Sequence, residues 1–344
     1  MRLTQINPAL SSLTFGSGTI TAGGVFKICS ALCALSTSEC LQVSPHIRKL
    51  DLRFNDIGDA GANSCCELIR VSTWLKDLYL RGCGISSVGA MSLGSALRAS
   101  ALHQLENFGL SDNVIGSDGL QSIGAALNVN TSLRILAINR IGFDIDGVKA
   151  LAEALKINGS LRELCIECNE IDPAGAGFLA DALQINSSLR IFSLCDNNIG
   201  DDGAELFSAA IRVNSTIEYI DLGGNGIGDS GTASFASMLR VNTGLQRVDL
   251  SRNGMGDTGA IALGIALTLN STLKCIELDY NEIGDGGVVA LCEALCANSN
   301  SALTTLTLFD NIFGASAAKW IDKVQRENSR LEPISLERVA RPED

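Results

Sequence analysis

Residues 189–216 read LRIFSLCDNNIGDDGAELFSAAIRVNST, and residues 217–244 read IEYIDLGGNGIGDSGTASFASMLRVNTG. The two segments align without a gap on the pattern L-x-x-L-x-L-x-x-N-x-I-G. Copies of this pattern open at residues 10, 47, 75, 105, 133, 161, 189, 217, 245, 273 and 303. Because six successive steps between residues 105 and 273 are each 28 residues long, the sequence predicts a repeat protein of eleven units.

Each unit predicts one strand followed by one helix. The alternating L-x-L core is typical of a short strand with one buried face. The stretch after G-D-x-G, for example residues 148–155, is rich in helix-forming residues with Leu spaced i, i+4. We expect the Asp of this motif, such as Asp201, to cap the helix that it begins. We expect the Asn after each helix, such as Asn158, to close that helix in the left-handed conformation.

The Asn at the ninth position of the pattern is expected to support the turn after the strand. An amide such as that of Asn225 or Asn253 can bond loop backbone groups that would otherwise be unpaired, and stacking would turn these residues into a ladder. In the fifth repeat, Ile141, Phe143 and Asp144 replace the usual Asn, Ile and Gly. We therefore expect the ladder to be interrupted at this repeat.

The order of elements predicts an α/β solenoid. A strand and a helix every 28 residues, all in one chain direction, give a parallel sheet on one side and helices on the other. Because a helix is about 10 Å wide and strands are about 4.8 Å apart, the stack should bend into a horseshoe with the sheet on its concave face and the helices on its convex face. We expect an N-terminal cap with the first repeat over residues 1–46, the repeats over 47–314, and a capping helix with a polar tail over 315–344.

These motifs carry a resemblance to a known family. The pattern resembles the leucine-rich repeat superfamily, and the 28-residue step with G-D-x-G…L-A-x-A-L…N-x-S-L resembles its ribonuclease-inhibitor type. That type includes ribonuclease inhibitor, the sensor regions of NOD-like receptors and the GTPase-activating protein of Ran. The resemblance covers residues 10–314 and implies the horseshoe fold, while the functions within this family differ.

Composition and charge exclude several classes of protein. The net charge of −12 argues against nucleic-acid binding, because the phosphate backbone would be repelled. No stretch reaches the roughly 18 to 20 apolar residues that cross a bilayer, and residues 1–8 lack the apolar segment of a secretory signal. We expect a cytoplasmic protein that binds neither membrane nor nucleic acid, whose 12 cysteines are reduced. We also expect a monomer, because a capped solenoid closes its own ends.

The usual catalytic patterns are missing from the sequence. There is no Gly-Lys dipeptide, so a Walker A phosphate loop is absent. The two histidines, His46 and His103, belong to no H-E-x-x-H motif. The single Cys165-x-x-Cys168 pair has no second pair and predicts reduced thiols rather than a zinc site. We expect no enzymatic activity, no cofactor and no metal.

The candidate binding residues lie on the expected concave face. The third, fifth and seventh positions of the pattern should point away from the core, and the eighth should lie at the edge of the sheet. The predicted partner-binding residues are Arg53, Tyr79, Arg81, Tyr219, Asp221, Arg247, Asp249, Glu277, Asp279, Tyr280 and Phe309.

Three of these carboxylates share the fifth position of consecutive repeats. Asp221, Asp249 and Glu277 should stack about 5 Å apart, and like charges this close require a cation or a basic partner. The alternative is a solvated acidic face that Arg247 and Arg252 partly balance.

Two functions of different classes follow from the sequence. The first is a non-enzymatic scaffold that binds a partner protein on its concave face, where these carboxylates would favour a basic partner. The second is a GTPase activator similar to that of Ran, in which Arg53 and Arg81 would approach the nucleotide on a bound GTPase. The chain lacks the acidic C-terminal tail of that family, and no local motif transfers its functional residues.

Overall fold

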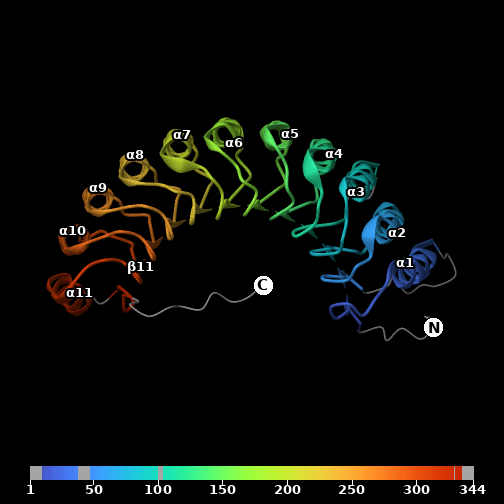
Figure 1. The fold of residues 1–344 in the computed structure, drawn as a ribbon, viewed down its shortest axis with the longest axis horizontal. Helices are drawn as coiled ribbons and strands as arrows, with labels where there is room; N and C mark the ends of the chain where they lie inside the picture. The colour runs from blue at the N-terminus through green and yellow to red at the C-terminus, as the bar shows by residue number, and fades with distance from the viewer. Residues whose placement is uncertain (1–9, 38–46, 100–103, 329, 335–344) are drawn as a thin grey trace. The chain divides into compact units, whose positions relative to one another are not determined.

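A computed structural model describes residues 10–37, 47–99, 104–328 and 330–334 of the chain. The chain separates into two compact units, unit 1 (Met1–Asn169) and unit 2 (Glu170–Asp344). Within each unit, short strands lie on one side and helices on the other (Figure 1). His46, His103 and most of the predicted tail lie outside the described residues.

Unit 1 alternates strands and helices as the sequence predicts. Its strands are β1 (Ser12–Thr14), β2 (Lys49–Asp51), β3 (Asp77–Tyr79), β4 (Asn107–Gly109), β5 (Ile135–Ala137) and β6 (Glu163–Cys165). Its helices are α1 (Ala22–Thr37), α2 (Gly58–Val71), α3 (Ser87–Ala99), α4 (Gly116–Leu127) and α5 (Ile145–Ile157). Neighbouring strands pair in parallel and in sequence order, with equivalent repeat positions opposite each other.

Unit 2 has the same organisation. It begins with α6 (Pro173–Ile185) and continues with β7 (Ile191–Ser193), α7 (Gly200–Val213), β8 (Tyr219–Asp221), α8 (Asp229–Leu239), β9 (Arg247–Asp249), α9 (Asp257–Leu267), β10 (Cys275–Glu277), α10 (Asp285–Ala297), β11 (Thr305–Thr307) and α11 (Ala315–Glu327). The strands again pair in parallel, each with its sequence neighbour. The structure thus confirms the predicted α/β repeat and its register.

The core of each repeat lies between its strand and its helix. The fourth and sixth positions of the pattern are buried, as at Ile220 and Leu222 in unit 2. The inward side of each helix is buried as well, as at Ala204 and Phe207 of α7. At the C-terminal end, Ala317, Ile321 and Val324 of α11 are the buried residues, while Trp320 stays partly exposed beneath the Lys323 ammonium.

The Asn ladder predicted at the ninth position is present. In unit 2 the Asn225 amide donates to the carbonyl oxygens of Leu194 and Gly223, and the Asn253 side-chain oxygen accepts from the backbone N–H of Asn225 and Ile227. Each amide therefore joins two successive turns, which leaves few buried polar groups of these turns without partners.

The ladder is interrupted at the fifth repeat, as predicted. Ile141 is buried and has no side-chain amide to offer to its neighbours, although its own N–H donates to the Asn169 side-chain oxygen. Asp144 stands in the place of the usual Gly, and its side chain caps α5 by accepting from the N–H groups of Asp146 and Gly147.

The Asn residues that follow the helices work differently from the prediction. Asn158 has φ −70° and ψ 119°, which is extended backbone and not the left-handed conformation. Its amide donates to the carbonyls of Leu127 and Asn130 in the preceding repeat, and its oxygen accepts from the N–H groups of Ser160 and Leu161. This Asn thus ends the helix by building a second ladder between repeats.

The prediction for the Asp of G-D-x-G was wrong. Asp229 lies in the first turn of α8, but its Oδ1 accepts from the N–H groups of Gly256 and Gly259 at the start of α9. Asp201 does the same for α8, and Asp257 for α10. The stacking of the repeats brings each carboxylate to the next helix, so an Asp in one repeat caps the helix of its successor.

Candidate functional site

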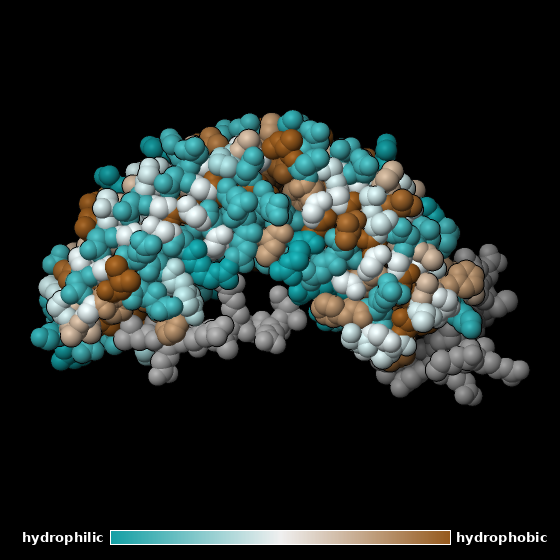
Figure 2. Space-filling model, viewed as in Figure 1, coloured by the Kyte–Doolittle hydropathy of each residue, from teal (hydrophilic) through white to brown (hydrophobic). Residues whose placement is uncertain are grey.

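The strand side of each unit carries most of the predicted binding residues. We call the surface formed by β1–β6 and the turns that follow them the inner face of unit 1, and that formed by β7–β11 and their turns the inner face of unit 2. Figure 2 shows hydrophilic atoms along both faces.

Tyr79 is the centre of a first cluster on the inner face of unit 1. The Lys49 ammonium lies 4.9 Å and the Arg53 guanidinium 5.6 Å from the centroid of its ring. Both cations also contact Asp51, with Arg53 Nε 3.0 Å and Lys49 Nζ 3.5 Å from its carboxylate oxygens. Gly109 on the neighbouring strand leaves room for the ring, because a Cβ there would lie 3.2 Å from Tyr79 Cδ1.

The buried Asp51 holds these cations in place. It is only 2% exposed, and burial alone would raise its pKa, but the hydrogen bonds and charge of Arg53 and the charge of Lys49 keep the pKa below its usual value. The carboxylate therefore stays ionised and orients Lys49 and Arg53 over Tyr79, a cation–π arrangement found at recognition surfaces.

A second cluster of unit 1 follows the turns after the strands. The Arg81 guanidinium lies 5.5 Å from the Phe54 ring centroid, and its Nε lies 2.5 Å from Asp112. Asp112 also pairs with Arg140 at 2.9 Å, and Arg140 reaches Cys168 Sγ at 3.6 Å. Arg81 was predicted from the sequence and Asp112 and Arg140 were not, although opposite charges at the eighth position of consecutive repeats were a usable signal.

Three of the predicted residues form one cluster on the inner face of unit 2. Arg247 on β9 stacks over Tyr219 on β8, with 4.7 Å between the guanidinium carbon and the ring centroid. The same guanidinium makes a forked pair with Glu277 on β10 at 3.0 to 3.2 Å. Burial, followed by the charges of Asp221 and Asp249, raises the pKa of Tyr219, so its phenol stays neutral.

The predicted column of exposed carboxylates needs correction. Asp221, Asp249 and Glu277 do stand opposite one another on consecutive strands. However, Asp221 is 5% and Asp249 is 3% exposed, because each turns back to accept from the N–H group two residues later, at Gly223 and Ser251. These two residues position the turn, and Glu277 is the member of the column that reaches the surface pair with Arg247.

The last predicted residues form an aromatic corner. Tyr280 and Phe309 pack edge to face, with 5.3 Å between their ring centroids. Asp279 accepts from the backbone N–H of Phe309 at 2.7 Å and so fixes the turn that presents this ring. Tyr280 is exposed, and paired aromatic side chains at a surface are typical of interface centres.

From the second repeat onward, the eighth position of the pattern is in the left-handed backbone region. In place of glycine it holds Phe54, Asp112, Arg140, Cys168, Asp196, Arg252, Tyr280 and Asp310, with φ between 50° and 58°. A residue other than Gly costs about 1–2 kcal/mol in this conformation.

Gly224 shows why glycine remains at this position in one repeat of unit 2. Arg252 reaches across Gly224 to pair with Asp196. A Cβ on Gly224 would collide with the Asp196 carboxylate and come within 2.9 Å of Arg252 Nη2. Arg252 was expected only to balance the column of carboxylates, and its pairing with Asp196 was not predicted.

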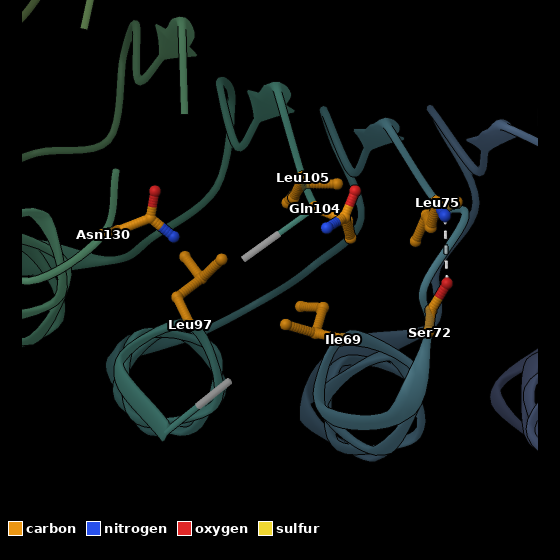
Figure 3. A pocket seen from close by; sticks show the side chains of 7 residues that line it. All are labelled: Ile69, Ser72, Leu75, Leu97, Gln104, Leu105 and Asn130. Carbon is orange, nitrogen blue, oxygen red and sulfur yellow. Dashed lines mark hydrogen bonds between the residues drawn. The ribbon is translucent and has the colours of Figure 1, made fainter. Parts of the chain in front are cut away.

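The cavities are small. One in unit 1, lined by Ile69, Ser72, Leu75, Leu97, Gln104, Leu105 and Asn130, has about 10 Å³, which is room for one water molecule (Figure 3). A groove of about 260 Å³ between α10 and α11 contains Cys296, whose pKa burial and Glu327 raise, so its thiol is a poor nucleophile. Among the residues that the structure describes, no group of three or more acidic, Cys or His side chains is placed to hold a metal ion.

No helix in the described ranges is long and apolar enough to span a bilayer.

Comparison with known proteins places this arrangement in a family. The Leucine Rich repeat family matches residues 43–64, 71–94, 186–208, 213–236, 241–264 and 269–292. The human NACHT, LRR and PYD domains-containing protein 5 is 28% identical over 165 residues, which are 42% of this chain and 14% of that protein. Ribonuclease inhibitor from Sus scrofa is 27% identical over 152 residues, or 38% of this chain and 33% of the inhibitor. The matches thus span a third or less of these relatives.

A solved structure supports the same fold. The yeast complex of Rad7 and Elc1 contains a chain that matches 90% of this one and is itself covered to 78%, with a TM-score of 0.55 and 17% identity. At this identity the similarity concerns the fold alone. Repeat pattern, parallel strand register and relatives agree that the chain is a leucine-rich repeat protein of the ribonuclease-inhibitor type.

Proposed function

We propose that this chain is a non-enzymatic interaction module that binds a partner protein through the inner faces of its units. The observation that carries the proposal is the cluster of Tyr219, Arg247 and Glu277, in which an aromatic ring and a forked ion pair meet on a strand surface. Tyr and Arg are the residues most enriched at the energetic centres of protein interfaces.

The remaining side chains of the inner faces support the same role. Lys49, Arg53 and Arg81 in unit 1 are each stacked on an aromatic ring and held by a carboxylate. Such side chains are fixed before a partner arrives, so little conformational entropy is lost on binding. The Tyr280–Phe309 pair gives the inner face of unit 2 an apolar anchor beside its charges.

Dimensions favour a protein or peptide over a small molecule. Consecutive strands are about 4.8 Å apart, so five or six of them give a surface on the order of 25 Å long in each unit. Each inner face is an open strand surface, whereas small molecules are usually enclosed in cavities of about 300–1,000 Å³.

The compartment and the class of partner are part of the proposal. We place the protein in the cytoplasm, supported by the eleven described cysteines, which are thiols and not disulfides. Asp221 and Asp249 are buried, so we expect less preference for a basic partner than the sequence predicts. The exposed groups on the inner face of unit 2 combine Arg247, Glu277 and aromatic rings. A partner with both charges and an apolar anchor fits this face.

The test is affinity capture from lysate of the source organism, read by mass spectrometry. The parent is run beside a unit 2 variant, Tyr219→Ala with Arg247→Ala, and a unit 1 variant, Tyr79→Ala with Arg81→Ala. Arg212→Ala is the matched control, because Arg212 is exposed in the last turn of α7 and lies away from the strands.

A partner bound by the parent and the control but lost from one inner-face variant supports the proposal and locates the interface. Equal capture by all four proteins, with melting temperatures unchanged, contradicts it. A small GTPase in the eluate would call for a hydrolysis assay, which tests the second function considered from the sequence.

A further inference from the structure

Helix α9 in unit 2 is apolar on both of its sides. Its inward side buries Ala260, Leu263 and Leu267 in the core. On its outward side Ile261 is 41% and Ile265 is 56% exposed, and Leu269, just after the helix, is 59% exposed. Because these three residues are spaced i, i+4 and i+8, they form one stripe along the helix, which we call the α9 stripe.

The repeat makes the α9 stripe easy to compare with its neighbours. The same three positions are Gly177, Asp181 and Ile185 on α6; Glu205, Ala209 and Val213 on α7; Ala233, Ser237 and Val241 on α8; and Val289, Glu293 and Ala297 on α10. Among the described helices that begin at Pro173, Gly200, Asp229, Asp257 and Asp285, only α9 has an aliphatic residue at all three. Amphipathic surface helices normally carry polar residues there.

The surroundings of the α9 stripe extend this apolar strip. On α8 the equivalent positions are uncharged, and Val241 at its end is 52% exposed. On the neighbouring helices, Arg240 at the end of α8 and Glu293 on α10 are exposed charged residues. Figure 2 shows hydrophobic atoms on the side of α9 that faces away from the strands. The core needs no aliphatic residues on this outward side, so their presence requires another explanation.

We infer that the α9 stripe is the docking surface for an amphipathic helix with basic flanks, supplied by a partner protein. The net charges of the two units indicate that the flanks of the partner helix are basic. Unit 1 contains 14 basic and 14 acidic side chains, whereas unit 2 contains 12 basic and 24 acidic ones, so the whole net charge of −12 belongs to unit 2. A basic segment is attracted to this unit, and a second copy of it is repelled.

The size of the strip also selects a single helix. A stable interface between two folded proteins buries about 800 Å² on each partner, and four side chains that are about half exposed cannot supply that area. The nine residues from Ile261 to Leu269 are eight helical steps, which rise about 12 Å, and this length matches the i, i+4, i+7 anchors of one bound helix. Ridges of this kind pack with the two helix axes about 8–10 Å apart.

This inference goes beyond the proposed function, because the α9 stripe lies on the helix side of unit 2 and the inner face lies on its strand side (Figure 1). A partner on the inner face and a helix on the stripe do not compete for the same residues. The two proposals therefore fail independently.

Binding of two synthetic peptides tests the inference. Both are about 18 residues long, which is five helical turns, and share one leucine face; one has Lys and the other Glu on its flanks. Fluorescence anisotropy is measured with the full chain at physiological salt. We expect the Lys peptide to bind at least tenfold more tightly than the Glu peptide, and Ile265→Asp to weaken Lys-peptide binding at least tenfold.

Ile185→Asp is the matched control, since Ile185 is 62% exposed at the end of α6 in the same unit and the change adds the same charge. Added negative charge alone attracts the Lys peptide, so a loss at Ile265 reports the apolar contact. Ile265→Ser, which adds no charge, must show the same loss, and both variants must keep the parent's melting temperature. Tyr219→Ala with Arg247→Ala must bind the Lys peptide like the parent.

Three outcomes overturn the inference. Equal weakening by Ile185→Asp and Ile265→Asp would show non-specific attraction to the acidic unit. If the Lys peptide does not bind at concentrations up to about 1 mM, a dissociation constant that corresponds to about −4 kcal/mol, the α9 stripe is not a docking surface for such a helix. A parent that forms dimers in sedimentation equilibrium and loses them on Ile265→Ser would assign the stripe to a second copy.

Discussion

Replacing Asp229 by Ala should loosen a helix other than the one that contains it. Asp229 Oδ1 accepts from the N–H groups of Gly256 at 2.9 Å and Gly259 at 2.7 Å, both at the start of α9. The variant leaves these two donors without their acceptor. Loss of an N-cap side chain costs about 1 kcal/mol, with a range of about 0.5–2 kcal/mol.

Hydrogen exchange read residue by residue measures this effect. A loss of about 1–2 kcal/mol corresponds to a 5- to 30-fold change in an equilibrium, so the amides of the first turn of α9 should exchange faster by about that factor. The first turn of α8, where Asp229 itself lies, should change less, because it loses only a favourable interaction with the helix dipole, about 0.3–1 kcal/mol.

Asp144→Ala is the matched control, because the Asp144 side chain caps its own helix, α5. There the loss of protection should appear in the helix that follows the mutated residue directly. If Asp229→Ala deprotects α8 and leaves Gly256 and Gly259 as in the parent, the assignment of the cap to the next repeat is refuted.

Three further results are expected. Gly224→Ala should destabilise the protein more than Gly226→Ala in urea unfolding, because both have positive φ but only a Cβ on Gly224 meets Asp196 and Arg252; equal losses would contradict the steric argument. Burial raises the pKa of Asp59, but hydrogen bonds from Ser86 and Gly89 lower it more, so the pKa lies below its ordinary value. The contribution of Asp59 to the free energy of unfolding is therefore present above about pH 4 and is lost as the pH falls. Asp59→Asn, whose oxygen does not titrate, should lose less stability than the parent between pH 5 and 2, and parallel curves would refute this. Burial raises the pKa of Tyr219, so the neutral phenol stabilises the folded protein fully below about pH 10, and this contribution is lost as the pH rises further. Tyr219→Phe should remove the highest-pH step of the phenol absorbance titration. An unchanged titration would contradict the burial of this ring.

The sequence was sufficient for the repeat, the register and most positions of the inner faces. Period and alternation depend on burial, and burial follows directly from which residues are apolar, as at Ile220 and Leu222. This is why Tyr219, Arg247 and Glu277 could be placed on neighbouring strands before any coordinates. The same reasoning located the interruption of the Asn ladder at Ile141.

The hydrogen-bond partners of the Asp side chains could not be predicted, because several backbone N–H groups near each carboxylate are chemically equivalent. Asp221 and Asp249 could have faced the solvent, but each accepts from the backbone N–H two residues later. Asp229 could have capped its own helix, but the start of α9 lies within reach of its carboxylate. Residue types alone do not show which N–H group donates to such a carboxylate, because this depends on the distance between stacked repeats.

The capping of α8, α9, α10 and α11 by an Asp of the preceding repeat gives this part of the chain a direction that its pattern does not show. A version shortened at its C-terminal end keeps the Asp acceptor for each of the helices α8 to α11 that remains. A version shortened from the other end strips the first surviving helix of its Asp, as α9 would be without Asp229. Such an array is therefore best extended by adding repeats at its C-terminal end, because each repeat already contains the Asp that caps the helix of the next one.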